Sequence, residues 1–246
     1  MILQTGSLPG DKLTFCAETS TPRGSLALLK GAEVLGGVEW NKEASHSESI
    51  AIFSQDLLSK YNLTWRDIHQ FGCGIGPGSF TGIRVAFNFV RSLSFFFSKP
   101  MIVATSFDLA LAPVLKKGAV FLVTHPAFRN LIYIQILKVH DARLEVLLPS
   151  CALTLEQIKK ALSHLQQPAH IVGAEANTVF KFLEACESKK LLASQVDSWP
   201  KAQNFSYLTH SNHFKTRPME WKETSPLYIR ASEAEEKLRL AMHVNS

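Results

Sequence analysis

The residues best suited to binding a small anion form a glycine-rich string at positions 72–84. Glycines let a chain turn sharply and expose successive backbone amides, and free amides at the start of a helix attract anions. The spacing matches neither a P-loop nor the dinucleotide-binding fingerprint. An anion site and a tight connection from strand to helix are therefore equal alternatives, and the candidate phosphate-binding residues are Gly76, Gly78 and Ser79.

A second candidate phosphate site is the run Glu18-Thr19-Ser20, where a carboxylate and two hydroxyls end an apolar stretch. A phosphate or a metal-bound water could dock on such groups. A hydroxyl-rich turn before Pro22 would instead use the same groups locally. Residue types alone leave both interpretations open.

The sequence gives little support to a metal site or a protease triad. The histidines and the four scattered cysteines show no metal-ligand spacing, so we expect no bound metal. Ser79, His46 and Asp108 could form a triad only if the fold brought them together. Ser79 lacks the sequence context of a nucleophile elbow and is better suited to the N-terminal cap of a helix.

Hydrophobic periodicity distributes these residues over alternating strands and helices. The first half predicts strands at 13–18, 24–30, 33–40, 69–75 and 101–105, with helices from residue 47 and at 82–98. The second half repeats the order more loosely, with strands at 119–124, 131–139, 144–148 and 171–173 and helices at 155–165 and 177–186. A charged helical pattern covers residues 232–242. Two related α/β halves are the expected result.

The predicted helix at 82–98 is apolar over more of its circumference than one core contact requires. One stripe contains Ile83, Phe87 and Val90, and a second contains Val85, Phe89 and Phe96. This pattern predicts burial on two sides. The second side is covered either by another layer of the same chain or by a partner subunit.

Composition indicates a globular chain with a large core. The 246 residues are 46% hydrophobic and carry a net charge of +5, with Lys and Arg spread along the sequence. No apolar run is long enough to span a membrane, and residues 1–12 lack the order of a signal peptide. We therefore expect a cytoplasmic protein without a membrane contact.

Four segments together resemble the TsaB (YeaZ) family. They are residues 17–21, 46–48, 76–84 and 225–230, and the most specific is Gly-Pro-Gly-Ser-Phe-Thr-Gly-Ile-Arg at 76–84. The resemblance implies an α/β chain with the actin-like, Hsp70-like ATPase (ASKHA) fold of two ribonuclease H-like lobes. It also implies a loose extension at 1–12, a first lobe at 13–108 joined by segment 226–246, and a second lobe at 109–225.

The same resemblance implies a noncatalytic subunit of a tRNA-modifying complex. Family members bind the catalytic subunit TsaD, with TsaE assisting, and also pair with themselves. The complex modifies the adenosine next to the anticodon in tRNAs that read ANN codons, and tRNA is reached through the complex. No cofactor is expected to bind tightly, whereas ATP or ADP could bind at the complex.

Departures from the catalytic relative indicate that this chain has no activity alone. Where that relative carries a His-x-x-x-His metal site, this sequence has Ser106 and Ala110, which offer no imidazole. The carboxylate at the end of the first strand is Glu18 here and aspartate in the family.

Pairing through the first-lobe helices would explain the second apolar stripe. The predicted interface residues are Ile50, Phe53, Leu57, Val85, Phe89 and Phe96. Two other functions remain open at this point, a glycoprotease-like peptidase and a stand-alone actin-like nucleotide-binding ATPase.

Overall fold

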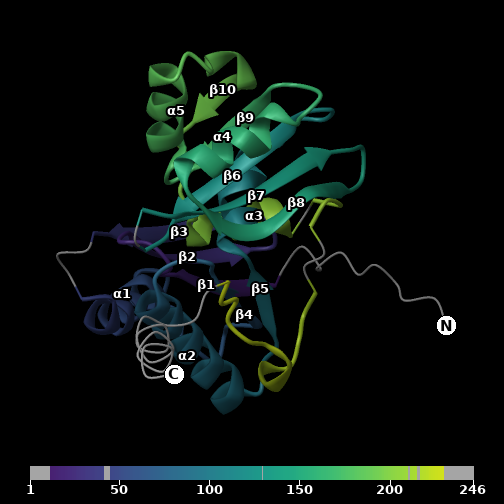
Figure 1. Cartoon of the computed structure of the whole chain (residues 1–246). Helices are drawn as coiled ribbons and strands as arrows, with labels where there is room; N and C mark the ends of the chain where they lie inside the picture. The colour runs from purple at the N-terminus through teal and green to yellow at the C-terminus, as the bar shows by residue number, and fades with distance from the viewer. Residues whose placement is uncertain (1–11, 42–44, 129, 210, 215–216, 230–246) are drawn as a thin grey trace, which may run out of the picture.

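Two five-stranded sheets with the same strand order form the two lobes of the molecule (Figure 1). The computed structural model describes residues 12–41, 45–128, 130–209, 211–214 and 217–229. The first sheet has the order β3-β2-β1-β4-β5 and the second β8-β7-β6-β9-β10. In each sheet three antiparallel strands are extended by two parallel ones. This repeated order confirms the expected fold of two ribonuclease H-like lobes.

The first lobe forms because its central strands are apolar on both faces. Phe15, Cys16 and Ala17 of β1 are completely buried, and α1 and α2 cover one face of the sheet (Figure 1). Its elements are β1 (Leu13–Glu18), β2 (Gly24–Lys30), β3 (Glu33–Trp40), α1 (His46–Lys60), β4 (Gln70–Gly74), α2 (Phe80–Phe97) and β5 (Met101–Ala104).

The second lobe repeats this plan with shorter helices. Helix α4 begins at a capping box, in which Thr154 and Gln157 satisfy each other's backbone amides. The lobe consists of β6 (Val120–Pro126), β7 (Ile132–Val139), β8 (Leu144–Leu153), α4 (Leu155–Ser163), β9 (Ala169–Gly173), α5 (Ala176–Ala185) and β10 (Leu192–Val196).

Helix α3 (Ser106–Leu111) joins the lobes by packing against both. Phe107 and Leu111 belong to a buried cluster with second-lobe residues, whereas Leu109 packs with strands of the first sheet. The 3-10 turn η1 (Ala112–Val114) follows directly. The two cores are therefore continuous through one short helix.

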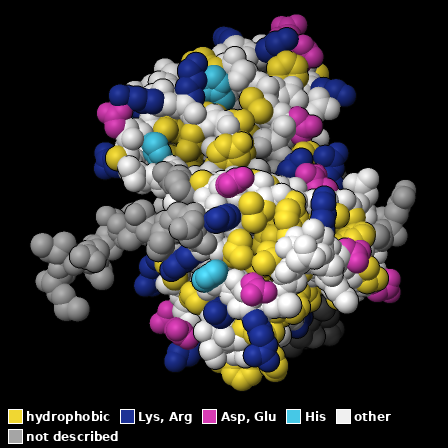
Figure 2. Space-filling model, turned by 180° about the vertical axis from the view of Figure 1, so that it is seen from behind, with side chains coloured by type: hydrophobic (Ala, Val, Ile, Leu, Met, Phe, Trp, Pro, Cys, Tyr) yellow, Lys and Arg dark blue, Asp and Glu magenta, His cyan; other side chains and the backbone are white. Residues whose placement is uncertain are grey.

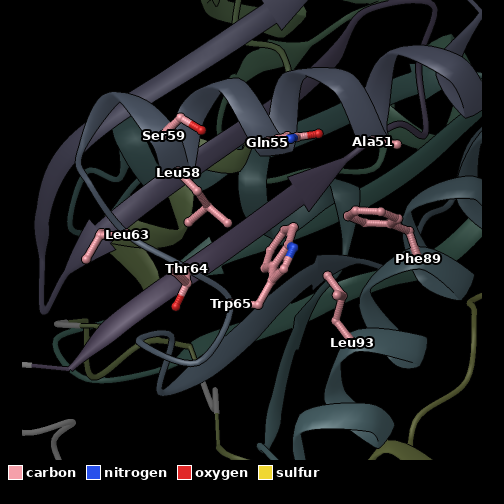
Figure 3. A pocket seen from close by; sticks show the side chains of 9 residues that line it. All are labelled: Ala51, Gln55, Leu58, Ser59, Leu63, Thr64, Trp65, Phe89 and Leu93. Carbon is pink, nitrogen blue, oxygen red and sulfur yellow. The ribbon is translucent and has the colours of Figure 1, made fainter.

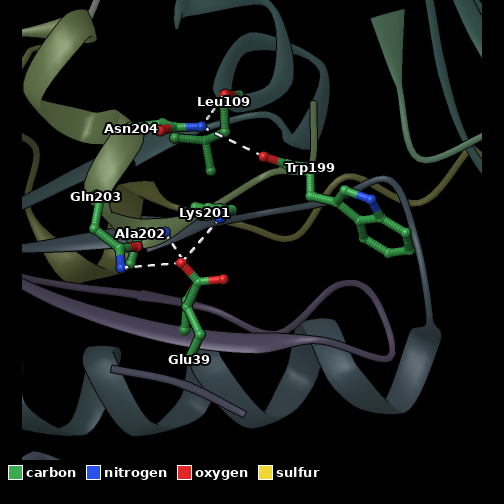
Figure 4. Close-up of polar contacts among 8 residues, drawn as sticks. Glu39, Leu109, Trp199, Lys201, Ala202, Gln203 and Asn204 are labelled. Carbon is green, nitrogen blue, oxygen red and sulfur yellow. Dashed lines mark hydrogen bonds and ion pairs between the residues drawn. The ribbon is translucent and has the colours of Figure 1, made fainter. Parts of the chain in front are cut away.

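The segment after β10 crosses back onto the first sheet. It contains η3 (Ala202–Asn204) and α6 (Phe205–Leu208), and Phe205 is buried against first-sheet strands. Figure 4 shows its polar anchors: Lys201 Nζ lies 3.0 Å from a Glu39 carboxylate oxygen, and Asn204 Nδ2 donates to the Leu109 carbonyl at 2.9 Å. Residues 201–208, which the sequence assigned to the second lobe, thus pack mainly against the first. The remaining turns are η2 (Lys189–Leu191) and η4 (Trp221–Glu223).

Most predicted elements are present, and the strands at 13–18, 24–30 and 33–40 have the predicted bounds. Helix α3 and strand β10 were missed, because each is short and mixed in composition. The extension up to residue 11, Arg230 and the predicted helix at 232–242 lie outside the described residues. In the described part of the chain, no helix has the length and apolar character needed to cross a membrane.

Candidate functional site

The glycine string packs directly against the turn that follows β1. Ser79 N donates to the Ser20 carbonyl at 2.8 Å. A Cβ added at Gly78 would collide with that carbonyl, and one at Gly82 would collide with the carbonyl of Thr19. Glycine is needed at both positions because two backbone segments touch there.

The hydroxyls of the candidate phosphate site are engaged inside the protein. Thr19 Oγ1 donates to the Gly82 carbonyl at 2.7 Å and accepts from Ala86 N at 3.2 Å. Ser20 Oγ accepts from Ser106 Oγ at 2.8 Å. Thr19 and Ser20 are both buried. A phosphate could reach these hydroxyls only by displacing the glycine string, so these residues do not fit a nucleotide phosphate as arranged.

Glu18 is a buried carboxyl with one unsatisfied oxygen. Its Oε1 accepts a hydrogen bond from Ser20 N, and its Oε2 has no hydrogen-bond partner among the described residues. Burial raises the pKa of Glu18 from 4.5 to about 7. Gly74 makes room for this side chain, since a Cβ there would overlap Oε2.

His125, on β6 of the second lobe, completes this polar junction. Its Nε2 lies 3.3 Å from Ser20 Oγ, and its Nδ1 has no partner in the described part of the chain. Burial lowers the pKa of His125 from 6.5 to about 3, so the ring is neutral. We define Glu18, Ser20, Ser106 and His125 as the lobe junction, a neutral polar contact that links the two sheets below about pH 7.

The structure does not assemble the proposed protease triad. His46 accepts from Trp40 Nε1 at 2.9 Å and is 2.9 Å from the Thr21 carbonyl through its other nitrogen. The Asp108 carboxylate accepts from both the backbone and the hydroxyl of Thr105. Ser79 Oγ accepts from Gly82 N at 3.2 Å and caps α2. Each member is therefore occupied by a separate structural contact.

The position of the relative's metal site is built from residues that do not fit a metal. Ser106 and Ala110 lie on α3; the Ser106 hydroxyl donates to Ser20, and Ala110 packs in the interlobe core. Among the described residues, no group of three His, Cys, Asp or Glu side chains could hold a metal ion.

A groove lies between α1, α2 and the loop that precedes β4 (Figure 3). It has a volume of about 360 Å³, and Trp65 and Phe89 point into it (Figure 3). The lining residues are Ala51, Gln55, Leu58, Ser59, Leu63, Thr64, Trp65, Phe89 and Leu93. Leu93 belongs to the second apolar stripe that the sequence predicts on this helix. The sequence missed Trp65, although an aromatic residue just after an amphipathic helix was the available signal.

The predicted interface residues separate into two groups. Ile50 and Leu57 are only 2% and 6% exposed and belong to the core under α1, so they are unavailable to a partner in this arrangement. They were chosen wrongly because helical spacing does not reveal which side faces the sheet. Phe53, Val85 and Phe89 are half-buried, and Phe96 is 76% exposed. We call the groove and these four residues the helical face.

Comparison with known proteins identifies the family. A family model described as TsaD, tRNA N6-adenosine threonylcarbamoyltransferase, matches residues 34–237. The tRNA threonylcarbamoyladenosine biosynthesis protein TsaB of Escherichia coli (strain K12) is 32% identical over 103 residues, which are 42% of this chain and 44% of that protein. The matched region thus spans less than half of the curated relative.

Two solved structures from Pseudomonas aeruginosa share the fold. YeaZ has a TM-score of 0.69 at 17% identity, covering 88% of this chain and 99% of that one. An uncharacterized protein with similarity to peptidase YeaZ has a TM-score of 0.67 at 18% identity, covering 89% and 100%. The chain belongs to the TsaD family of the matching model, and these relatives identify it there as of the TsaB/YeaZ type.

Proposed function

We propose that this chain acts in the biosynthesis of tRNA threonylcarbamoyladenosine as a noncatalytic partner of TsaD. The modified base would be the adenosine next to the anticodon in tRNAs that read ANN codons. TsaE would assist in the same complex, and tRNA would be reached through that complex. The similarity to TsaB in sequence and to YeaZ in fold supports this assignment.

The helical face is the observation that carries the partner role. Half-buried Phe89 and Trp65 border a groove with a mainly apolar lining, and the exposed ring of Phe96 lies on the same helix as Phe89. Buried aromatic anchors at the centre of an interface can each contribute about 2 kcal/mol or more to binding. A TsaD surface that fills the groove would cover these side chains, and a second copy of this chain could use the same face.

The lobe junction supports a role without catalysis. Glu18 is sealed under the glycine string, and Ser106 and Ala110 offer no metal-binding imidazole. We therefore expect the isolated chain to bind no nucleotide tightly, and ATP or ADP to bind only at the assembled complex. The peptidase alternative lacks an assembled triad among the described residues.

Co-purification with tagged TsaD tests the partner role. Phe89→Asp places a charge in the groove and should abolish recovery of the complex, while the variant stays soluble and folded. Phe128→Asp is the matched control, because Phe128 is 63% exposed and lies in the second lobe beyond β6. Complex formation by Phe89→Asp at the wild-type level would contradict the proposed interface.

Depletion in the source cell tests the pathway itself. Mass analysis of tRNA nucleosides should then show loss of threonylcarbamoyladenosine, restored by the wild-type gene. An unchanged level of this nucleoside would refute the proposed function.

A further inference from the structure

Three side chains at the start of α2 form an exposed cluster of aromatic rings and positive charge. The rings of Phe80 and Tyr228 lie 4.8 Å apart between centroids, with 33° between their planes. The Arg84 guanidinium lies 5.3 Å from the Phe80 ring centroid. Phe80 is 37% and Tyr228 43% exposed. We call these three residues the aromatic platform.

The fold assembles the platform from segments far apart in the sequence. Phe80 and Arg84 are four residues apart on α2 and share one side of the helix. Leu227 N donates to the Ile75 carbonyl at 2.8 Å, which fixes Tyr228 beside the helix start. The two ring-bearing segments are thus held in place by backbone contacts as well as by the rings.

Arg84 gives the platform a positive charge on a helix that contains no acidic residue. The sequence contains no Asp or Glu between Asp67 and Asp108, and none in residues 225–229. Arg84 forms no ion pair with the residues that the structure describes. On the face that Figure 2 shows, Lys and Arg lie among Asp and Glu.

Exposed aromatic rings beside an arginine that has no ion pair among the described residues are suited to single-stranded RNA. Unpaired bases stack on aromatic side chains or on guanidinium planes, while arginine also neutralises the phosphate backbone. An acidic peptide would satisfy the charge of Arg84 but would not need two exposed rings. We propose that the aromatic platform stacks an unpaired base of the RNA substrate, with Arg84 contacting a neighbouring phosphate. This inference rests on the proposed function, which supplies RNA as the substrate class.

The test measures binding of the full chain to an RNA hairpin with a seven-nucleotide loop containing 2-aminopurine. Stacking should quench the 2-aminopurine fluorescence, and Phe80→Leu or Tyr228→Leu should raise the Kd about tenfold and remove the quenching. Tyr228→Phe keeps the ring and should bind like the wild type. Arg84→Gln should weaken binding and lower the salt dependence by about one phosphate contact.

Arg91→Gln is the matched control, because Arg91 is on the same helix but contacts Trp221 and Phe87 instead. It should leave the hairpin Kd and the quenching unchanged. No quenching with the wild type, or equal binding by Phe80→Leu, would overturn the proposal. Loss of TsaD binding by Phe80→Leu with unchanged RNA binding would overturn it too and identify a protein contact.

The RNA-binding test of the platform and the depletion test of the proposed function can fail independently of each other. If depletion removes threonylcarbamoyladenosine but Phe80→Leu binds the hairpin normally, only the platform is refuted. If the nucleoside is unchanged after depletion, the proposed function fails regardless of RNA binding.

Discussion

The lobe junction and the helical face use side chains in opposite ways. At the junction, Glu18, Ser20 and His125 are polar and fully or almost fully buried. On the helical face, the aromatic ring of Phe96 is mostly exposed and that of Phe89 only half-buried. Burying polar groups and exposing apolar ones both cost free energy, so each arrangement needs its own explanation.

The difference separates what holds this chain together from what it offers to others. The junction links the two lobes through short contacts that involve only this chain. The helical face leaves apolar area that the described part of the chain covers incompletely. Substitutions at the junction should therefore change the stability of the fold, whereas substitutions of exposed residues on the helical face should change binding to a partner.

Among the substitutions in and beside the lobe junction, the largest effect is expected for Gly82→Ala. In an ordinary helix this change stabilises by about 0.5–1 kcal/mol, but here the new Cβ would collide with the Thr19 carbonyl. We expect the free energy of unfolding in urea to fall by about 3 kcal/mol. Asn88→Ala, an exposed control on the same helix, should not destabilise. A Gly82→Ala protein as stable as the wild type would show that the first turn of α2 does not touch the turn after β1.

Glu18→Gln should produce a smaller, pH-dependent effect. The raised pKa of Glu18 means that its contribution to stability is present below about pH 4.5 and is lost as the pH rises through about 7. Glutamine stays neutral, so the stability of the variant relative to the wild type should rise by about 2.5 kcal/mol between pH 5 and pH 8.

The titration of His125, which has the opposite sense, does not disturb this comparison. Its lowered pKa gives stability that is present above about pH 6.5 and is lost as the pH falls towards 3. This contribution is common to the wild type and Glu18→Gln, so it cancels in their difference. An equal difference in unfolding free energy at pH 5 and pH 8 would contradict a buried, protonated Glu18.

The sequence predicted the strands of the first lobe well because β1 and β2 carry continuous apolar runs. It did not predict the junction, since Ser20 and His125 are 105 residues apart and the motif that contains Ser20 does not include His125. It also misplaced Ile50 and Leu57, because a helix with apolar residues on several sides does not specify which side meets the sheet. Local sequence patterns thus predict helices and strands, whereas contacts between the lobes can be identified only from the three-dimensional structure.

Ser106→Ala should cost about 1 kcal/mol of unfolding free energy. It removes the hydroxyl that donates to Ser20 Oγ at 2.8 Å and leaves a buried acceptor with one partner fewer. Ser59→Ala is the control, because Ser59 is exposed on α1. Chemical denaturation measures the unfolding free energy of both variants. Equal values would show that the Ser106 hydroxyl does not stabilise the junction.

The smallest effect on stability is expected for Phe96→Ser on the helical face. The ring is 76% exposed, so its removal should change the unfolding free energy by no more than about 0.5 kcal/mol. Phe87→Ser on the same helix removes a buried ring and should cost about 3 kcal/mol or more. If Phe96 serves association, its substitution should instead weaken co-purification with TsaD. A Phe96→Ser protein with unchanged TsaD binding would restrict the contact to the groove around Phe89, and one that is strongly destabilised would show that the ring belongs to the core.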